Sequence, residues 1–309
     1  MENLKKAWSL AKQNRSALVS LIGINLINAL VVGVLSALFE QIDNGFLDVI
    51  FTLLMLIVGI GLSFISVIST LHLLKKCVFQ SETMSFSQMY SEFFSYAKKN
   101  WTSYIGTYAI WNILIPGAVD VLALVIGTVI LLLFTGGTLF WFIGNIHYYV
   151  YADPYSLIYH LMNNLPVLFI GVAAVFLTSV FTGVFSQAAA YNGVYKISAQ
   201  QDGRLNYVPR FSECMTLAAF PILITSILGV FVVIFTLFGF VVNPFLGIVL
   251  LILGSFLLVI AGIAAIVYKY VSFIKIILDE SEDQLAAGKS DGYQYADPRY
   301  PNMPSIPKR

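Results

Sequence analysis

The stretch CMTLAAFPILITSILGVFVVIFTLFGFVVNPFLGIVLLILGSFLLVIAGIAAIVY, Cys214 to Tyr268, contains 55 residues and no charged side chain. A helix crosses the roughly 30 Å hydrocarbon core of a bilayer with about 20 apolar residues, so this stretch has room for two crossings. Near its middle lie Asn243 and Pro244. Proline donates no backbone hydrogen bond and keeps the residue before it out of the helical region. We therefore predict a membrane hairpin that turns at Asn243 and Pro244.

Long apolar stretches also make up most of the remaining chain, at residues 17–39, 49–74, 101–146 and 154–195, with Asp120 as the only charge inside them. Of the 309 residues, 59% are hydrophobic and 11% are charged, whereas soluble domains carry about 25% charged residues. We predict an all-α polytopic transmembrane bundle over residues 1–283. It should contain about seven apolar helices and a few short amphipathic helices at the interface.

The 17 lysine and arginine residues gather in four islands along the chain. Positive residues beside membrane helices stay on the cytoplasmic side, so all four islands and the N-terminus are expected in the cytoplasm. We expect a protein of the cytoplasmic (inner) membrane. The islands are Lys5, Lys6, Lys12 and Arg15; Lys75, Lys76, Lys98 and Lys99; Lys196, Arg204 and Arg210; and six residues from Lys269 onward.

The number of crossings between the second and third islands decides the topology. An even number is required if both islands are cytoplasmic. The apolar pattern instead predicts three helices, at about residues 101–115, 119–146 and 166–190. Either the short first helix, which we expect to end at Pro116 and Gly117, is re-entrant or lies in the interface, or the segment 196–210 faces outward. We favour the first arrangement, and six, seven or eight crossings remain open.

A shift of 121 residues superimposes parts of the sequence on each other, for example Ser91-Glu92 on Ser212-Glu213. The match predicts two repeat units, at residues 49–153 and 167–274, each with an apolar helix, a polar segment and an apolar hairpin. Similar composition is the alternative explanation. The relative orientation of the two units also stays open.

The segment before Trp101 has the pattern of an amphipathic helix. Ser85-Phe-Ser-Gln88 matches a capping box, and apolar residues recur at helical spacing after it. Basic and aromatic side chains follow, as expected where a helix meets lipid headgroups. The simpler alternative is a helix that only covers the cytoplasmic ends of the bundle. The lipid interface that we predict here consists of Lys75, Lys76, Lys98, Lys99 and Trp101, and residues 1–15 and the segment from Asp153 show similar patterns.

Four polar residues fall inside or beside the apolar stretches, namely Asn25, Asn28, Asn112 and Asp120. Polar groups in a bilayer mark ion or substrate pathways unless they bond neighbouring helices. Helix packing is the simpler role for the first two, and a solvated turn is the simpler place for Asp120, which follows Pro116 by four residues. A transporter would line a water-accessible cavity with such side chains.

Motifs for catalysis or cofactor binding are absent from the sequence. It has no H-E-x-x-H, G-x-S-x-G, P-loop or dinucleotide fingerprint, and its histidines are too scattered for a metal site. We therefore expect no enzyme activity, no metal and no cofactor. A net charge of +1 without a long basic run argues against nucleic acid as a partner. The two cysteines, Cys77 and Cys214, fit a reduced compartment.

The end of the chain, residues 284–309, is rich in proline and tyrosine and lacks apolar periodicity. This composition predicts a disordered cytoplasmic tail. Pro298, Pro301, Pro304 and Pro307 fall every third residue, along one edge of a polyproline II helix. Such an edge is a docking motif for a partner protein, and a plain flexible tail is the simpler alternative.

Several short motifs resemble a group of uncharacterised bacterial multi-pass membrane proteins related to the membrane domain of glycerophosphodiester phosphodiesterases. In that group the phosphodiesterase domain is a separate soluble module, and no stretch of this chain fits one. The resemblance implies a membrane part without a catalytic part. It also implies that Tyr151 to Asn164 is cytoplasmic, in conflict with the favoured crossing count. The motifs are Trp111 followed by Ile115-Pro116-Gly117, Tyr151-Ala-Asp-Pro154, Ala190-Tyr191 and Leu278-Asp279-Glu280.

These patterns together favour a non-enzymatic function. The leading expectation is a scaffold or accessory factor that organises lipids or a membrane complex through its interfacial helices. Its expected partners are membrane lipids and a membrane protein. The alternative is a transporter or permease subunit, and a lipid-acting membrane enzyme comes third.

Overall fold

The computed structural model describes residues 2–39, 45–135, 144, 165–203 and 209–286 of the chain. Helices make up almost all of this described backbone, and no β-strand occurs in it. The predicted all-α class is therefore confirmed. The chain divides into two compact units. Unit 1 contains Met1–Tyr108, Val194–Val208 and Ile263–Arg309, and unit 2 contains Ala109–Gly193 and Pro209–Gly262.

Six of the described helices are long and apolar enough to cross a membrane, which supports the expectation of a multi-pass membrane protein. Many of their apolar side chains are exposed; Leu124 is 70% exposed and Phe245 is 75% exposed. Apolar surface on this scale is costly in water and is expected where hydrocarbon is the solvent. The spans are Arg15–Leu38, Val49–Phe79, Phe86–Ile130, Ala173–Gln201, Phe211–Thr236 and Phe245–Ser281.

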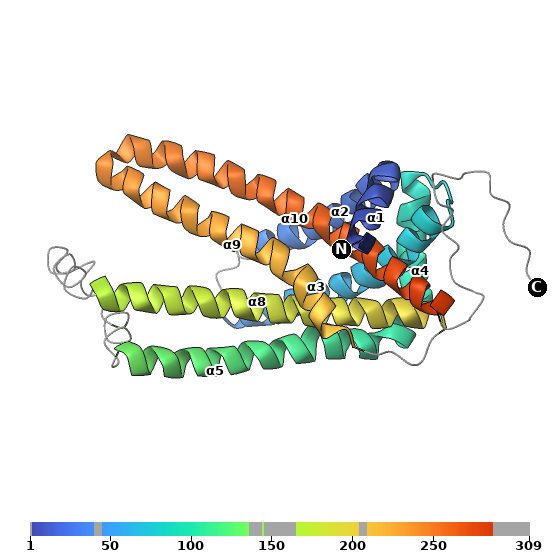
Figure 1. Ribbon diagram of the computed structural model, residues 1–309, viewed down its shortest axis with the longest axis horizontal. Coiled ribbons are helices and arrows are strands. Elements are labelled where there is room, and N and C mark those ends of the chain that lie inside the picture. The colour runs from blue at the N-terminus through green and yellow to red at the C-terminus, as the bar shows by residue number, and fades with distance from the viewer. Residues whose placement is uncertain (1, 40–44, 136–143, 145–164, 204–208, 287–309) are drawn as a thin grey trace, which may run out of the picture. The chain divides into compact units, whose positions relative to one another are not determined.

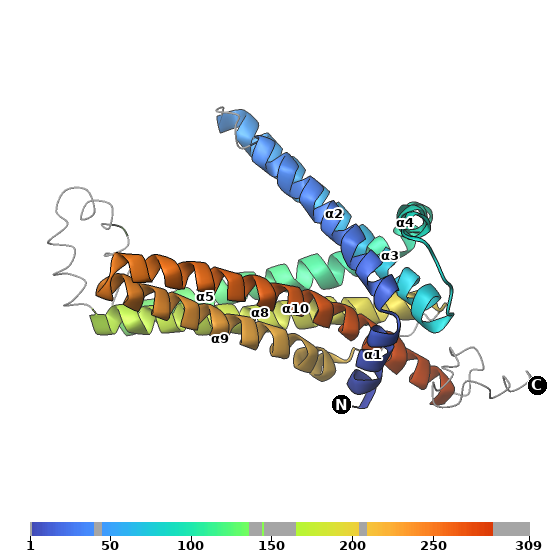
Figure 2. The ribbon, with the colours of Figure 1, turned by 90° about the horizontal axis from the view of Figure 1, so that it is seen from above.

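Unit 1 combines the start of the chain with the ends of two later helices. Figure 2 shows α1 set at an angle to α2. Asn14, a turn residue, separates the two helices in the sequence. The core of the unit includes Leu21, Ile68, Phe93, Tyr195 and Ile274, all fully buried. Its elements are α1 (Glu2–Gln13), α2 (Arg15–Phe39), α3 (Gly45–Leu74), the π-helical turn η1 (Lys75–Phe79), α4 (Phe86–Ala109) and the ends of α8 (Leu165–Gln201) and α10 (Pro244–Ala286).

Unit 2 consists of two helix pairs. Its elements are the π-helical turn η2 (Ile110–Leu114), α5 (Ile115–Thr135), most of α8, α9 (Phe211–Val242) and the first part of α10. Figure 1 shows α5 beside α8, and α9 beside the start of α10. The first pair is in contact, because a Cβ on Gly127 of α5 would lie 3.5 Å from the Cγ2 of Thr178 on α8.

The hairpin predicted at Asn243 and Pro244 is confirmed. Helix α9 ends at Val242 and α10 begins at Pro244, with Asn243 extended between them at φ −161° and ψ 128°. The Oδ1 of Asn243 accepts a hydrogen bond of 2.8 Å from the backbone N–H of Phe245, which caps α10. The two helices approach closely, because a Cβ on Gly239 would lie only 3.0 Å from the Cα of Gly247.

The prediction that a helix ends at Pro116 and Gly117 is wrong. Helical backbone continues from Phe86 through η2 and α5 to Thr135. In η2 the backbone N–H of Ile115 donates to the carbonyl of Ile110, five residues back. This π-turn shifts the hydrogen-bond ladder just before Pro116, where a regular α-helix would press the proline ring against a carbonyl. One continuous helix therefore occupies residues where two were expected.

Some predictions fall outside the described residues. The segment Tyr151 to Asn164, with the interfacial helix expected from Asp153, lies outside them, as does the tail from residue 287 onward. At the predicted start of the tail, α10 continues to Ala286 instead of ending at residue 283. The repeat units 49–153 and 167–274 stay a prediction.

Candidate functional site

Helix α4 begins with the capping box expected from Ser85 and Gln88. The Ser85 backbone N–H donates to the Gln88 Oε1 at 2.8 Å, and the Gln88 backbone N–H donates to the Ser85 Oγ at 3.3 Å. These bonds satisfy N–H groups that the first helical turn leaves without partners. Beyond this start α4 buries one face, formed by Met89, Phe93, Ala97, Tyr104, Thr107 and Tyr108.

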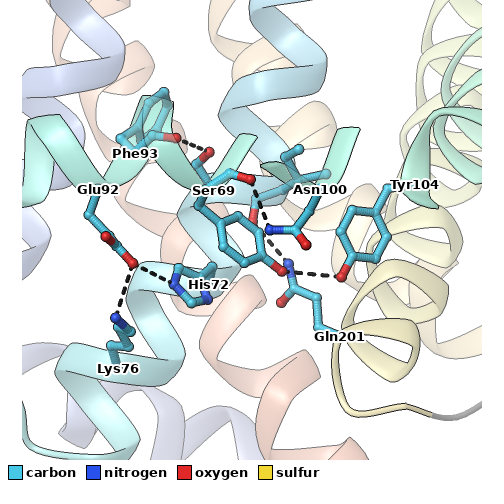
Figure 3. A network of polar contacts seen from close by, with 10 residues as sticks. Ser69, His72, Lys76, Glu92, Phe93, Asn100, Tyr104 and Gln201 are labelled. Carbon is cyan, nitrogen blue, oxygen red and sulfur yellow. Dashed lines mark hydrogen bonds and ion pairs between the residues drawn. The ribbon is translucent and has the colours of Figure 1, made fainter. Parts of the chain in front are cut away.

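A carboxylate joins α4 to the end of α3. The Oε1 of Glu92 accepts a hydrogen bond from the Nζ of Lys76 at 3.0 Å and lies 3.1 Å from the Nε2 of His72. Figure 3 shows Glu92 of α4 reaching toward both of these side chains. The His72 ring in turn stacks on Tyr96 of α4, with ring centroids 3.7 Å apart and planes 8° apart. Glu92 and Tyr96 of α4 thus contact His72 of α3 and Lys76 of η1.

Further hydrogen bonds extend this network behind α4. The Oγ of Ser69 on α3 donates to the carbonyl of Phe93, and both groups are buried (Figure 3). The hydroxyl groups of Tyr96 and Tyr104 lie 3.2 Å apart. From the end of α8, the Nε2 of Gln201 donates to the carbonyl of Ile68 at 3.0 Å. The inner face of α4 is therefore fixed to α3 by polar as well as apolar contacts.

The outer face of α4 carries three of the residues that the sequence assigned to a lipid interface. Lys98, Lys99 and Trp101 are exposed, and Trp101 is 49% exposed. Neither lysine forms an ion pair or a hydrogen bond within the part of the chain that the structure describes. We call these three residues the α4 basic face. Its position is set by the contacts on the other side of the helix, while its ammonium groups stay available to a ligand.

The other two lysines assigned to the interface are engaged within the protein. Lys75 is 3% exposed, and its Nζ donates to the Oδ1 of Asp202 and to the carbonyl of Ser198, both at 2.8 Å. Lys76 is paired with Glu92. A buried ammonium needs such partners because an isolated charge in the protein interior is very costly. The structure thus places Lys75 in a buried ion pair and Lys76 in a partly exposed one.

Asn25 ties three helices of unit 1 together. Its Nδ2 donates to the hydroxyl oxygen of Tyr270 on α10 at 2.7 Å and lies 3.3 Å from the Oγ1 of Thr70 on α3. Its Oδ1 accepts a hydrogen bond from Ser66. Asn28, one turn further along α2, lines a cavity of about 320 Å³, and its buried Nδ2 has no hydrogen-bond partner among the described residues.

Asn112 and Asp120 both belong to unit 2. Asn112 lies in η2, and a Cβ on Gly193 would be 2.8 Å from its Nδ2 and 2.7 Å from the Cβ of Trp111, so α8 can approach only with glycine there. Asp120 lies in the body of α5 and not in a turn. Its Oδ1 accepts a hydrogen bond from the Ser186 hydroxyl at 3.2 Å, and its side chain lines a groove between α5 and α8.

Sequence reasoning missed a buried cluster around Asp279. The Oδ2 of Asp279 accepts hydrogen bonds from the Tyr195 hydroxyl and from the Nζ of Lys275, and its Oδ1 accepts one from the Nδ2 of Asn3 at 2.8 Å. Asp279 is 5% exposed. The spacing of four between Lys275 and Asp279 is a local signal for this pair. The partners on α1 and α8 are distant in sequence and leave no such signal.

The described residues contain no group of three histidine, cysteine, aspartate or glutamate side chains that could hold a metal ion. Cys77 and Cys214 are both buried, and neither forms a disulfide within the described part of the chain. No protein-family model, curated protein or solved structure matches this chain. The resemblance to the membrane domain of glycerophosphodiester phosphodiesterases therefore stays a prediction.

Proposed function

We propose that the protein is a non-enzymatic component of a membrane, a scaffold or accessory factor that organises lipids or a membrane complex. The α4 basic face carries this proposal. Lys98 and Lys99 have no partner among the described residues and lie near the exposed Trp101. The opposite face of the same helix is buried in the protein. Each basic residue near an anionic membrane surface contributes about 1 kcal/mol of attraction, and tryptophan favours the headgroup level.

Because α4, η2 and α5 form one continuous helix, the crossing count supports placing the basic islands on the same side of the membrane. The described helices between the second and third islands supply two spans, the one that includes α5 and the one in α8. An even number returns the chain to the same side of the membrane, as the positive-inside rule requires. In this proposal the N-terminus and the α4 basic face are cytoplasmic, and the membrane is the cytoplasmic membrane of a bacterium.

Helix α1 extends the proposal to a second interfacial helix. It buries Ala7, Leu10 and Ala11 on one side. On the other side Lys12 is exposed, and Trp8 is 55% exposed. This division between a packed face and a basic, aromatic face is typical of helices that lie in the plane of a membrane.

A second candidate, a transporter or permease subunit, is favoured by one feature of unit 2. The groove that contains Asp120 has a volume of about 430 Å³. Hydroxyl and carboxylate groups between membrane helices are typical of ion and substrate pathways. The scaffold ranks first because Asn25, another residue considered for such a pathway, is engaged in helix packing. The groove residues with polar side chains are Asp120, Thr128, Thr178, Ser179 and Thr182.

The α4 basic face is expected to select anionic lipid beside Trp101. The measurement uses full-length protein in which Trp101 is the only tryptophan, reconstituted in equal amounts of phosphatidylcholine and phosphatidylglycerol. We expect brominated phosphatidylglycerol to quench Trp101 fluorescence more strongly than brominated phosphatidylcholine. Replacing Lys98 and Lys99 with glutamine should lower this selectivity by about fivefold per lysine, because each charge contributes about 1 kcal/mol.

Two matched controls accompany this experiment. Lys98→Arg with Lys99→Arg keeps both charges and should keep the selectivity. Lys76→Gln removes a lysine that is engaged with Glu92 and should leave the Trp101 signal unchanged. Equal quenching by the two brominated lipids in the protein with both lysines intact would contradict the proposal.

A further inference from the structure

Two adjoining cavities of unit 1 lie beside α2 and α10. One has a volume of about 180 Å³ and is lined by residues of α2, α3 and α10. The other has a volume of about 360 Å³ and is lined by residues of α1, α2 and α10. Ile22 and Tyr270 line both cavities. The two cavities therefore adjoin at these side chains, and we call the pair the α1–α10 groove.

Three cations surround this groove. Lys12 and Arg15 line the larger cavity, and Lys269 lines the smaller one. All three are exposed, and no acidic side chain lines either cavity. Within the described part of the chain, Lys12 and Arg15 form no ion pair, and the Nζ of Lys269 lies 5.8 Å from the centre of the Phe273 ring. The groove thus presents positive charge that the described residues do not neutralise.

Two of the cations adjoin long apolar stretches of the chain. Arg15 is the first residue of the span formed by α2, and Lys269 directly follows the 55-residue uncharged stretch. Phe273, on which the Lys269 ammonium lies, is one turn further from that stretch. A lysine stem that runs along an apolar surface toward the interface in this way places its charge at the headgroup level.

Apart from the polar side chains of Asn25, Ser66, Thr70 and Tyr270 in the smaller cavity, the uncharged residues that line the groove are apolar. Ile22 of α2 and Ile266 of α10 line its smaller cavity. Beyond them, Leu26 and Leu30 of α2 and Ile263 of α10 are 54%, 59% and 58% exposed. Such a surface suits a hydrocarbon chain that begins at the interface and runs along both helices.

The two walls of the groove are held together by hydrogen bonds. The Tyr270 hydroxyl on α10 donates to the carbonyl of Leu21 on α2 at 3.3 Å and accepts a hydrogen bond from Asn25. The spacing of α2 and α10 is therefore set without a ligand. A preformed site binds more tightly because less conformational freedom is lost on binding.

We propose that the α1–α10 groove binds one anionic phospholipid. Lys12, Arg15 and Lys269 bind its phosphate, and Ile22 and Ile266 contact its acyl chain. The inference rests on the proposed lipid-organising function and adds a defined site, on helices other than α4. Binding needs both the anionic headgroup and the acyl chain. A soluble phosphate lacks the acyl chain, and the headgroup of a zwitterionic lipid carries a cation that the three basic residues repel.

Trp8 lines the larger cavity and reports on its occupant. In full-length protein with Trp8 as the only tryptophan, we expect brominated phosphatidylglycerol to quench the fluorescence in clear preference to brominated phosphatidylcholine. Lys12→Gln with Arg15→Gln should lower this preference by about 25-fold, and Lys269→Gln by about fivefold. Ile22→Phe fills the groove without a change of charge and should weaken quenching by either lipid.

The controls separate this site from general surface charge. Lys98→Gln with Lys99→Gln removes two charges from α4 and should leave the Trp8 preference intact, whereas it should lower the Trp101 preference by about fivefold per lysine. Inorganic phosphate should not compete with the lipid. The proposal is overturned by equal quenching of Trp8 by both lipids, by full competition from phosphate, or by equal loss in the α4 variant. Protection of the buried Cys77 thiol shows that each variant is folded, and Lys269→Gln and Ile22→Phe provide the test if the double variant unfolds.

Discussion

Replacing Lys75 with methionine is expected to lower the free energy of unfolding by about 3–5 kcal/mol. The side chains of Lys75 and Asp202 are 4% and 11% exposed, so the substitution removes the Lys75 ammonium from a largely buried carboxylate. It also removes the donor to the carbonyl of Ser198. Replacing both members of the pair, as in Lys75→Met with Asp202→Leu, should recover much of the loss, because apolar substitutes need no counter-charge.

Lys76→Met is the matched control for this prediction. It is the same substitution at the next residue, where the side chains of Lys76 and Glu92 are 28% and 31% exposed. It should lower the free energy of unfolding by no more than about 1 kcal/mol. The measurement is detergent-induced unfolding of the full chain, followed by the reactivity of the buried Cys77 thiol in a Cys214→Ala background. Equal losses of stability in the two variants would show that the Lys75 pair is not the buried contact described above.

Replacing Asp279 with alanine is expected to lower the free energy of unfolding by a similar amount, about 3–5 kcal/mol. Its carboxylate accepts hydrogen bonds from Lys275, Tyr195 and Asn3, which lie on α10, α8 and α1. The side chains of Lys275 and Asp279 are 12% and 6% exposed, so water replaces the lost contacts poorly. Asp279→Asn keeps one acceptor oxygen, so its free energy of unfolding should lie between those of Asp279→Ala and the unsubstituted protein.

Asp120→Ala provides the comparison for Asp279. Asp120 is exposed and makes one described hydrogen bond, to Ser186, so its removal should change stability by less than about 1 kcal/mol. The same unfolding assay measures both variants. If Asp279→Ala unfolds at the same detergent concentration as Asp120→Ala, the cluster around Asp279 does not hold α1, α8 and α10 together.

Features coded by neighbouring residues were predictable from the sequence. The hairpin follows from Asn243 and Pro244, whose backbone restrictions act within one turn. The start of α4 follows from Ser85 and Gln88, which bond each other directly. The length of the apolar stretches was sufficient to predict the all-α class and the membrane spans.

Features that depend on distant contacts were not predictable in this way. Lys75 was assigned to lipid because it belongs to a basic island, whereas its partner Asp202 lies 127 residues away. The helix end at Pro116 was wrong because a proline normally breaks the α-helical ladder, and the π-turn that accommodates it leaves no pattern in the sequence. The sequence alone therefore does not show which lysines of a basic island are buried in ion pairs and which are exposed.

The orientation of the basic islands is the claim on which the proposed function depends most, because it places the α4 basic face on the anionic cytoplasmic surface. Single cysteines at Ser87, Ser212 and Val242, in a Cys77→Ala and Cys214→Ala background, test it directly; all three positions are exposed. With a membrane-impermeant maleimide applied to sealed vesicles of known orientation, we predict that Ser87→Cys and Ser212→Cys react from the cytoplasmic side and Val242→Cys from the opposite side. Reaction of Ser87→Cys and Ser212→Cys from opposite sides of the membrane would contradict the account.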